Sequence, residues 1–532
     1  MDRFTRLVSL ASLVLAASPQ HTFAATKKCT AGQACWPSAD TWATFNASIG
    51  GRLVAPVPPA AVCHNDRGLY DAAACEVAKA NWTNSFWRAS QVGAYEDLVW
   101  ENGRQECYID APQDAPCQQG LVPSLATAAQ SSADIQASVK IPGMISSFSI
   151  WTHNLRGIAF NNSFTPAGCP ASGSSPGITI QPGEHWIDVY KAADEQGVIV
   201  VGGAARSVGA AGGWVLGGGH SALGPLYGMG VDNVLQFTVV TADGEERTAN
   251  ACSEQDLFWA LRGGGGSAFG QRRHWRHHLE WSYHPRHKLH HDQSRQTLAN
   301  SEQGGWSGYL SAPPSGQGDP GALFIQANSP FGAEVAAGNY TGVNATFASL
   351  FNAGSNISTT YYAFPTYYSF VDNVITDIAI GVNSITGGRL LDEDALTKKA
   401  ATLVTLSTVD PAGGSIFHMV AGGAVSKFAP DSVSLHPYWR KAIVSFNFGL
   451  SWGTNTTSII KEALRKSLTT KIQVLAHLID DDAASYTNEA DSQEPQWRKA
   501  FWGSHYPRLL EIKKKVDPNN VFTCNRCVGS EL

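Results

Sequence analysis

Apolar positions in the middle of the chain predict alternating strands and helices. One segment has helical spacing, with Val189 and Ala193 on the same face and Gly197 following as a residue type that commonly ends a helix. The dipeptide Asp243-Gly244 predicts a tight turn between two strands. Strands are expected over residues 177–180, 198–201 and 234–240, and helices over 186–196 and 256–262.

The flanking regions have other compositions. Residues 25–116 are rich in Trp and Ala and contain five of the ten cysteines. Residues 320–480 are rich in Thr, Ser and Tyr, with a strand expected at 358–364 and helices at 395–405 and 457–475. The 532 residues, 43% of them apolar, allow several structural units with a large core, and we predict an α+β fold.

A glycine-rich run lies between two of the expected strands. Residues 202–221 contain eight glycines in close clusters, interleaved with Trp, Val and Leu. Glycine at this density is retained where the backbone turns sharply or approaches another surface, and exposed N–H groups in such loops bind anions such as pyrophosphate. The run therefore predicts a cofactor-binding loop. A flexible linker is the alternative, although linkers usually lack such large apolar residues.

Several motifs occur in order between residue 217 and the C-terminal region of the chain. They are Gly217–Leu223, Gly228–Leu235, Val239–Gly244, Asp256–Gly266, Tyr486–Asp491, Phe501–Gly503 and Lys513–Phe522. Together they resemble the FAD-linked oxidase family, which includes vanillyl-alcohol oxidase and berberine bridge enzyme relatives. Within that family the chain looks most like fungal secreted members of the isoamyl-alcohol-oxidase type. Ordered motifs of this kind are far more specific than a single glycine motif.

The resemblance implies an FAD-binding domain of the PCMH type in two parts, together with a substrate domain containing an antiparallel sheet. The flavin domain is expected at 117–298, the substrate domain at 299–483, and a C-terminal tail that returns to the flavin domain at 484–532. A helical section tied by disulfides is expected at 25–116. The implied chemistry is hydride transfer from an alcohol or a secondary-metabolite intermediate to flavin, with O₂ reoxidising the flavin.

The resemblance also implies the residues of the site. Tyr486 and Asn488 match a Tyr-x-Asn motif that contacts the isoalloxazine, and Tyr486 is the one candidate for a catalytic base; alternatively, Tyr486 satisfies buried backbone. His220 is either a proton group beside the flavin or a buried histidine bonded to backbone. The implied cofactor-binding residues are Gly202, Gly203, Ser207, Val208, Gly209, Gly213, Gly217, Gly218, Gly219, His220, Ser221, Gly230, Asp232, Val239 and Asn488.

The chain departs from the family at both points of covalent flavin attachment. Ala205 occupies the position of the cysteine that forms a thioether in bicovalent members. Residues 138–147 stand where relatives have the loop whose histidine carries the other link, and no histidine lies between His64 and His153. Any FAD is therefore expected to be bound non-covalently, and a folded, flavin-free remnant of the family is the alternative.

The beginning of the chain and the cysteines indicate the secretory pathway. Arg3 and Arg6 precede an apolar run, so residues 1–24 read as a signal peptide, and no later apolar stretch is long enough to span a membrane. Ten cysteines favour disulfides, and Cys524 and Cys527 are expected to form a structural bridge, with a redox pair or half of a zinc site as alternatives. The seven glycosylation sequons are at Asn46, Asn81, Asn161, Asn339, Asn344, Asn356 and Asn455.

Charge and histidine content add two further points. A net charge of −6 with 15% charged residues makes a nucleic-acid partner improbable, while nothing indicates the oligomeric state. Residues 271–295 are rich in Arg and His where relatives have an apolar strand. We expect this window to loop out of the flavin domain, as an out-of-frame or mis-spliced stretch. A solvated loop, a nucleic-acid patch and a metal site with His274 and His278 on one helical face are the alternatives.

Overall fold

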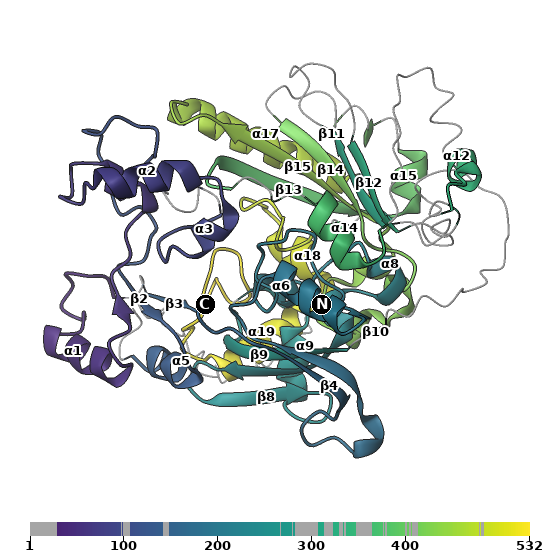
Figure 1. The fold of residues 1–532 in the computed structure, drawn as a ribbon, viewed down its shortest axis with the longest axis horizontal. Coiled ribbons are helices and arrows are strands. Elements are labelled where there is room, and N and C mark those ends of the chain that lie inside the picture. Colours follow the sequence, from purple (N-terminus) through teal and green to yellow (C-terminus); the bar gives the residue numbers. More distant parts are fainter. Residues whose placement is uncertain are drawn as a thin grey trace, which may run out of the picture.

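Two five-stranded sheets dominate the computed structural model of the chain (Figure 1). In this view α6 (Trp186–Glu195) and α18 (Trp497–Trp502) lie between the two sheets. The structure describes residues 29–96, 107–141, 148–278 without 267, 280–281, 307–312, 323–328, parts of 334–346, and 364–532 with short gaps at 376–412 and 478–483. Helices and antiparallel sheets together confirm the predicted α+β fold.

The first sheet has the strand order β4-β5-β9-β7-β8, and all of its pairings are antiparallel. Its strands are β4 (Ile158–Phe164), β5 (Ser175–Ile180), β9 (Gln271–His278), β7 (Val234–Val240) and β8 (Glu246–Asn250). The strand predicted at 234–240 is β7, and Gly244 has a φ of 74° in the turn that leads to β8. A left-handed backbone at this position explains the Asp-Gly pair.

The prediction that residues 271–295 loop out is wrong for the part of the window that the structure describes. β9 is the central strand of the first sheet, with Trp275 opposite Ile180 on one side and Phe237 on the other. Beyond it, β10 (Glu280–Trp281) pairs with β6 (Val198–Ile199). Ladder hydrogen bonds are made by the backbone, so a polar sequence can fill the gap between β5 and β7 and leave neither edge unpaired. His274 and His278 thus lie on a strand and share no helical face.

The second sheet has the order β12-β11-β14-β15-β13 and is also antiparallel, as expected for the substrate domain. Its strands are β11 (Ser307–Ala312), β12 (Leu323–Asn328), β13 (Asn383–Leu391), β14 (Gly413–Met419) and β15 (Val444–Trp452). The long helix α17 (Ser458–Ala476) lies against β13 and β15 in Figure 1 and matches the helix predicted at 457–475. The strand expected at 358–364 falls almost entirely outside the described residues.

The helices of the flavin and substrate regions largely follow the sequence pattern. α6 ends one residue before the predicted boundary, and Gly197 has the left-handed φ of 68° that its role requires. α9 (Gln255–Leu261) and α15 (Glu393–Lys398) correspond to the helices expected at 256–262 and 395–405. The strand predicted at 198–201 is shorter, since only β6 is paired there. Further helices are α5 (Ser132–Val139), α7 (Gly213–Leu216), α8 (Gly224–Tyr227), α12 (Thr341–Thr346) and α14 (Tyr367–Val374).

The N-terminal part of the described chain contains helices and disulfides. It contains α1 (Ala39–Ser48), α2 (Ala72–Asn81) and α3 (Ser85–Ala89), at the left of Figure 1. A small sheet joins β1 (Leu53–Val54), β2 (Leu125–Ala128) and β3 (Phe148–Trp151). The disulfides of this section are Cys29–Cys35, Cys63–Cys75 and Cys107–Cys117.

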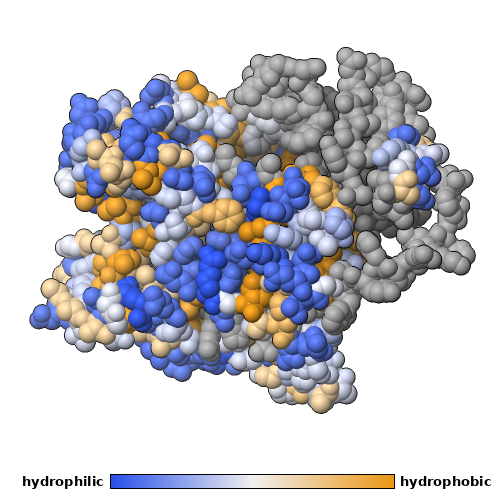
Figure 2. Space-filling model, in the orientation of Figure 1, coloured by the Kyte–Doolittle hydropathy of each residue, from blue (hydrophilic) through white to orange (hydrophobic). Residues whose placement is uncertain are grey.

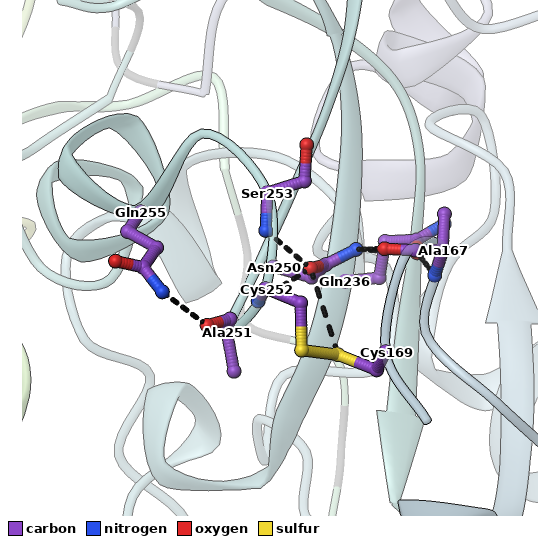
Figure 3. The surroundings of a disulfide bond; sticks show 8 residues. All are labelled: Ala167, Cys169, Gln236, Asn250, Ala251, Cys252, Ser253 and Gln255. Carbon is purple, nitrogen blue, oxygen red and sulfur yellow. Dashed lines mark hydrogen bonds between the residues drawn. A yellow bond between two sulfur atoms is a disulfide. The ribbon is translucent and has the colours of Figure 1, made fainter. Parts of the chain in front are cut away.

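A fourth disulfide, Cys169–Cys252, ties the loop between β4 and β5 to the end of β8 (Figure 3). Asn250 sits beside it, with Nδ2 donating to the carbonyl oxygen of Ala167 at 2.9 Å and to Oε1 of Gln236 at 3.0 Å. The bridge spans 83 residues, so it constrains a long part of the unfolded chain.

The expected bridge between Cys524 and Cys527 is absent. The amide of Cys524 donates to Sγ of Cys527 at 2.8 Å, and that thiol lies 3.0 Å from the carbonyl oxygen of Cys524. The side-chain hydrogen bond with Cys524 lowers the pKa of Cys527; the Cys524 backbone amide and the nearby positive charge of buried Lys513 add to this, although burial opposes the shift. The two residues follow α19 (Tyr506–Val516), in the tail that packs beneath α9. The pair is therefore a dithiol held in a tight turn.

No helix in the described part of the chain is long and apolar enough to cross a membrane. On the face shown in Figure 2, hydrophobic residues form scattered patches among hydrophilic ones. The signal peptide expected at 1–24 lies outside the described residues.

Candidate functional site

The glycine-rich loop is packed tightly against indole rings at several points. A Cβ on Gly202 would overlap Trp186, and one on Gly230 would overlap Trp214. At Gly219, where φ is 70°, a Cβ would lie 2.8 Å from the same indole of Trp214. Trp186 and Trp214 contact each other edge to face, with ring centroids 4.6 Å apart. Part of the glycine content thus serves the packing of the loop on its own domain.

Another part of the loop is open. A Cβ on Gly209 or Gly213 would meet nothing within 4 Å, and Gly213 is exposed at the start of α7. Gly266, at the end of the second glycine run, is half-buried and lies against Gly213. Small residues beside unfilled space leave backbone N–H groups accessible, which is the arrangement that a pyrophosphate requires. The predicted positions Ser207 and Val208 belong to the same half-buried stretch.

The C-terminal tail docks onto the base of this loop. Asn488 donates from Nδ2 to the carbonyl oxygens of Gly213 at 3.0 Å and Trp214 at 3.4 Å. The hydroxyl of Tyr486 donates to the same Trp214 oxygen at 3.3 Å and accepts from Asn488 at 2.7 Å. A Cβ on Gly217 would lie 2.5 Å from Oδ1 of Asn488. The Tyr-x-Asn motif therefore hydrogen-bonds to the backbone of Gly213 and Trp214 and packs against Gly217, which places Tyr486 and Asn488 beside the loop.

Next to Tyr486, three ionisable side chains from three parts of the chain converge. Nε2 of His220, in the loop, lies 2.8 Å from Oε1 of Glu489 in the tail. Nδ1 of His418, on β14 of the substrate sheet, lies 3.4 Å from Oε2 of the same carboxylate. The rings of His220 and Tyr486 are 4.8 Å apart. We call His220, His418 and Glu489 the His–Glu–His cluster.

Asn447 on β15 fixes the carboxylate of this cluster. Its Nδ2 donates to Oε2 of Glu489 at 2.9 Å and lies 3.4 Å from Nδ1 of His418. A Cβ on the adjacent Gly388 would overlap the Asn447 side chain, so the amide has little freedom to turn. The ring of Tyr309 on β11 packs edge-on against His418 at 5.5 Å.

The pKa values of Glu489 and of the neighbouring Tyr486 are shifted by their surroundings. Burial by itself raises the pKa of Glu489. The charges and hydrogen bonds of His220 and His418 outweigh this effect, so the pKa of Glu489 lies well below the usual range. Burial, followed by the charge of Glu489, raises the pKa of Tyr486 far above that of a free tyrosine. Glu489 is therefore an anion at all physiological pH values, whereas Tyr486 keeps its proton.

The remaining predicted residues take structural positions. Asp232 forms a buried bidentate pair with Arg440, at 2.8 and 2.7 Å, which ties the loop to the substrate domain. Val239 is fully buried in β7, and the hydroxyl of Ser221 accepts from the amide of Leu223 at 3.1 Å. The ring of His220 bonds a carboxylate and no backbone group among the described residues, so the backbone-bonded form expected as one alternative is not found.

Sequence reasoning missed Glu489, His418 and Asn447. Glu489 directly follows the recognised Tyr-x-Asn motif, so its position next to the loop was a usable signal. His418 and Asn447 lie on two strands that are paired only in three dimensions, and no spacing along the chain links them.

Comparison with known proteins extends these observations. Residues 174–250 match the family described as FAD binding domain, and residues 485–529 match the family described as berberine and berberine like. An uncharacterized FAD-linked oxidoreductase of Arthroderma benhamiae is 36% identical, covering 98% of this chain and 98% of that protein. An FAD-linked oxidoreductase of an Aspergillus species is 31% identical, covering 95% and 88%.

Solved structures show the same fold. A VAO-type flavoprotein from Myceliophthora thermophila C1 superposes with a TM-score of 0.81 at 26% identity, covering 96% of this chain and 98% of that one. A berberine bridge enzyme variant solved with (S)-reticuline has a TM-score of 0.60 at 15% identity, covering 92% and 99%, and is similar in fold alone.

Proposed function

Because the chain belongs to the vanillyl-alcohol oxidase and berberine bridge enzyme family of FAD-linked oxidoreductases, we propose that it acts outside the cell on an alcohol or a secondary-metabolite intermediate. FAD, when bound, accepts a hydride from the substrate and is reoxidised by O₂. The His–Glu–His cluster carries this proposal, since it places proton-handling groups from both domains beside the loop that would hold the cofactor.

The open part of the loop is the proposed site of the FAD phosphates. Gly209, Gly213 and Gly266 present backbone next to unfilled space, and Ser207 and Val208 extend the same stretch. Residues 217–221 and the Tyr486–Asn488 pair lie between this stretch and the cluster, where the isoalloxazine would be held. Val239, Gly202, Gly203, Gly218 and Gly230 support the loop from beneath.

We propose that the cofactor is held without a covalent bond. Ala205 offers no nucleophile, and residues 202–219 of its loop contain neither cysteine nor histidine. Residues 142–147, where the second link would be sought, lie outside the described part and contain neither residue type. Affinity must then come from backbone contacts and burial alone.

Secretion fits the covalent features of the chain. Four disulfides stabilise the described fold, which is typical of oxidising compartments. Four of the seven sequon asparagines are exposed: Asn161, Asn339, Asn344 and Asn455.

The test is to express the full chain in a secreting eukaryotic host and record its absorbance in the flavin bands. We expect a flavin spectrum, release of the flavin into the supernatant on acid precipitation, and hydrogen peroxide formation with members of a panel of primary and benzylic alcohols. A folded, glycosylated protein that is colourless even after incubation with FAD would instead establish the flavin-free remnant. Flavin that stays on the denatured protein band would contradict non-covalent binding.

A further inference from the structure

We propose that His418 is the group that takes the hydroxyl proton of the substrate. Glu489 orients the imidazole of His418 and stabilises its protonated form. The inference rests on the proposed function, because it names the proton acceptor of that oxidation. It is carried by the geometry of the His–Glu–His cluster and by the difference between the two nitrogens of His418.

One nitrogen of His418 faces the cluster. Nδ1 lies 3.4 Å from Oε2 of Glu489, whose orientation is set by the 2.9 Å hydrogen bond from Asn447. Nδ2 of Asn447 is also 3.4 Å from Nδ1, but this amide donates to the carboxylate at the shorter distance of 2.9 Å. The carboxylate therefore holds the proton on Nδ1, which leaves the lone pair on Nε2. The distance is long for a hydrogen bond, as is common for catalytic pairs before substrate binds.

The other nitrogen, Nε2, is available. No described residue hydrogen-bonds to it, and the side chain of His418 keeps 12% of its surface accessible, compared with 9% for His220. The side chain of Glu489 is 29% exposed, so the cluster is open to solvent at this carboxylate. The edge-on ring of Tyr309 supports His418 on the substrate sheet.

The neighbouring candidates are less suitable. Tyr486, the base expected from the sequence, keeps its proton because its pKa is raised by burial and by Glu489. His220 directs Nε2 to Glu489, while its Nδ1 is fully buried without a partner and cannot meet a substrate. His220 therefore serves, together with His418, to keep Glu489 ionised.

The proton step balances with the groups present. The O–H bond of the substrate breaks, its electron pair stays on oxygen, and an N–H bond forms at Nε2 of His418. The imidazolium that results lies beside the anionic Glu489, which compensates the new charge without a change in its own protonation. The two-electron oxidation of the carbon is the activity of the family.

Alkylation by phenacyl bromide, a neutral aromatic reagent, tests the accessible lone pair without needing a substrate. Attack by Nε2 forms a C–N bond and releases bromide, and peptide mapping by mass spectrometry locates the product. We expect His418 in the folded full chain to react about tenfold faster than His477, an exposed histidine whose Nδ1 lies 2.6 Å from the carbonyl oxygen of Gln473. Glu489→Gln should slow His418 about tenfold, whereas Glu511→Gln, on the exposed side of α19, should not.

A second measurement follows anaerobic flavin reduction by benzyl alcohol and by the best alcohol of the panel. His418→Ala should lose a factor of about 10²–10⁴ in the rate of reduction, with partial recovery in added imidazole, and with unchanged flavin content and melting temperature. Unreactive His418, equal labelling in Glu489→Gln, or full activity of His418→Ala would each overturn the assignment. Normal labelling with no reduction by any alcohol in the wild type would count against the proposed function and leave the His418–Glu489 pair intact.

Discussion

Asn488 in the C-terminal tail donates a hydrogen bond to the carbonyl oxygen of Gly213 in the glycine-rich loop, over a distance of 3.0 Å and a sequence separation of 275 residues. This contact explains why the glycine-rich loop and the Tyr-x-Asn motif, which are far apart in the sequence, lie side by side in the structure. The tail reaches the base of the loop only if the loop has no side chain at Gly217. Its docking also delivers Glu489 to His220, so the same contact assembles the cluster.

Two glycine-to-alanine substitutions should separate docking from cofactor binding. In Gly217→Ala the new methyl group would lie 2.5 Å from Oδ1 of Asn488, and we expect a loss of about 1–3 kcal/mol in the free energy of unfolding. In Gly213→Ala the methyl group enters open space, so stability should change by less than about 0.5 kcal/mol while flavin content falls. Urea unfolding and flavin absorbance measure the two effects. Equal stability of both variants would show that Asn488 does not need Gly217.

The buried ion pair of Arg389 and Glu494 should be costly to break. Its atoms Nη2 and Oε2 are 2.6 Å apart, and both side chains are 1% exposed. Glu494→Ala leaves a buried guanidinium uncompensated, which costs about 3–5 kcal/mol. Asp394→Ala removes the exposed partner of Lys398 and should cost less than about 1 kcal/mol. Chemical denaturation of both variants tests the contrast, and a small effect of Glu494→Ala would mean that water reaches Arg389.

The disulfides should differ in their contribution to stability according to the loop they close. Cys169–Cys252 spans 83 residues and Cys29–Cys35 spans six. Loop-closure entropy gives about 4.5 kcal/mol for the first and about 2 kcal/mol for the second. Serine pairs at each position, compared by thermal unfolding, should reproduce this order. A larger effect at Cys29–Cys35 would show that native contacts decide the outcome and that loop length does not.

Stability should fall when the pH drops below neutral, and His185 should account for part of the loss. Burial, together with the charge of Arg156, lowers the pKa of His185 to about 4. An unfolded histidine titrates near 6.5, so between about pH 6.5 and 4 the unfolded chain binds the extra proton and stability decreases with falling pH. The contribution is about 1–3 kcal/mol. His185→Gln should flatten the dependence measured by urea unfolding at pH 7 and pH 5, and His477→Gln should leave it unchanged.

The sequence allowed the fold to be predicted where local rules decide it. The amphipathic spacing of α6, the left-handed Gly197 and the continuous apolar run of β7 needed no knowledge of distant contacts. The cofactor loop was predicted from its own glycine clusters, whereas the Tyr-x-Asn motif was predicted from the family resemblance.

Features that depend on distant partners could not be predicted. His418 and Asn447 meet Glu489 only because β14 and β15 pair and the tail docks on the loop. The bridge expected at Cys524 and Cys527 failed for a different reason, since the turn brings the sulfur of Cys527 to the backbone amide and carbonyl of Cys524. The prediction for β9 was wrong because it relied on the polar side chains of the strand. The place of β9 in the sheet is set by backbone hydrogen bonds to the strands on both sides.

The position of β9 gives the last prediction, which separates a central strand from a looped-out segment. Arg276 stands opposite Thr179 of β5 and Gln236 of β7, so proline there removes a ladder donor in the middle of the sheet and imposes its own φ. We expect Arg276→Pro to lose about 3 kcal/mol or more and to be secreted poorly, whereas Arg276→Val keeps the amide and should remain folded. Secretion yield and limited proteolysis measure both variants. If Arg276→Pro is secreted and resists protease as well as Arg276→Val does, residues 271–278 do not hold the centre of the sheet, and the polar window stands outside the flavin domain after all.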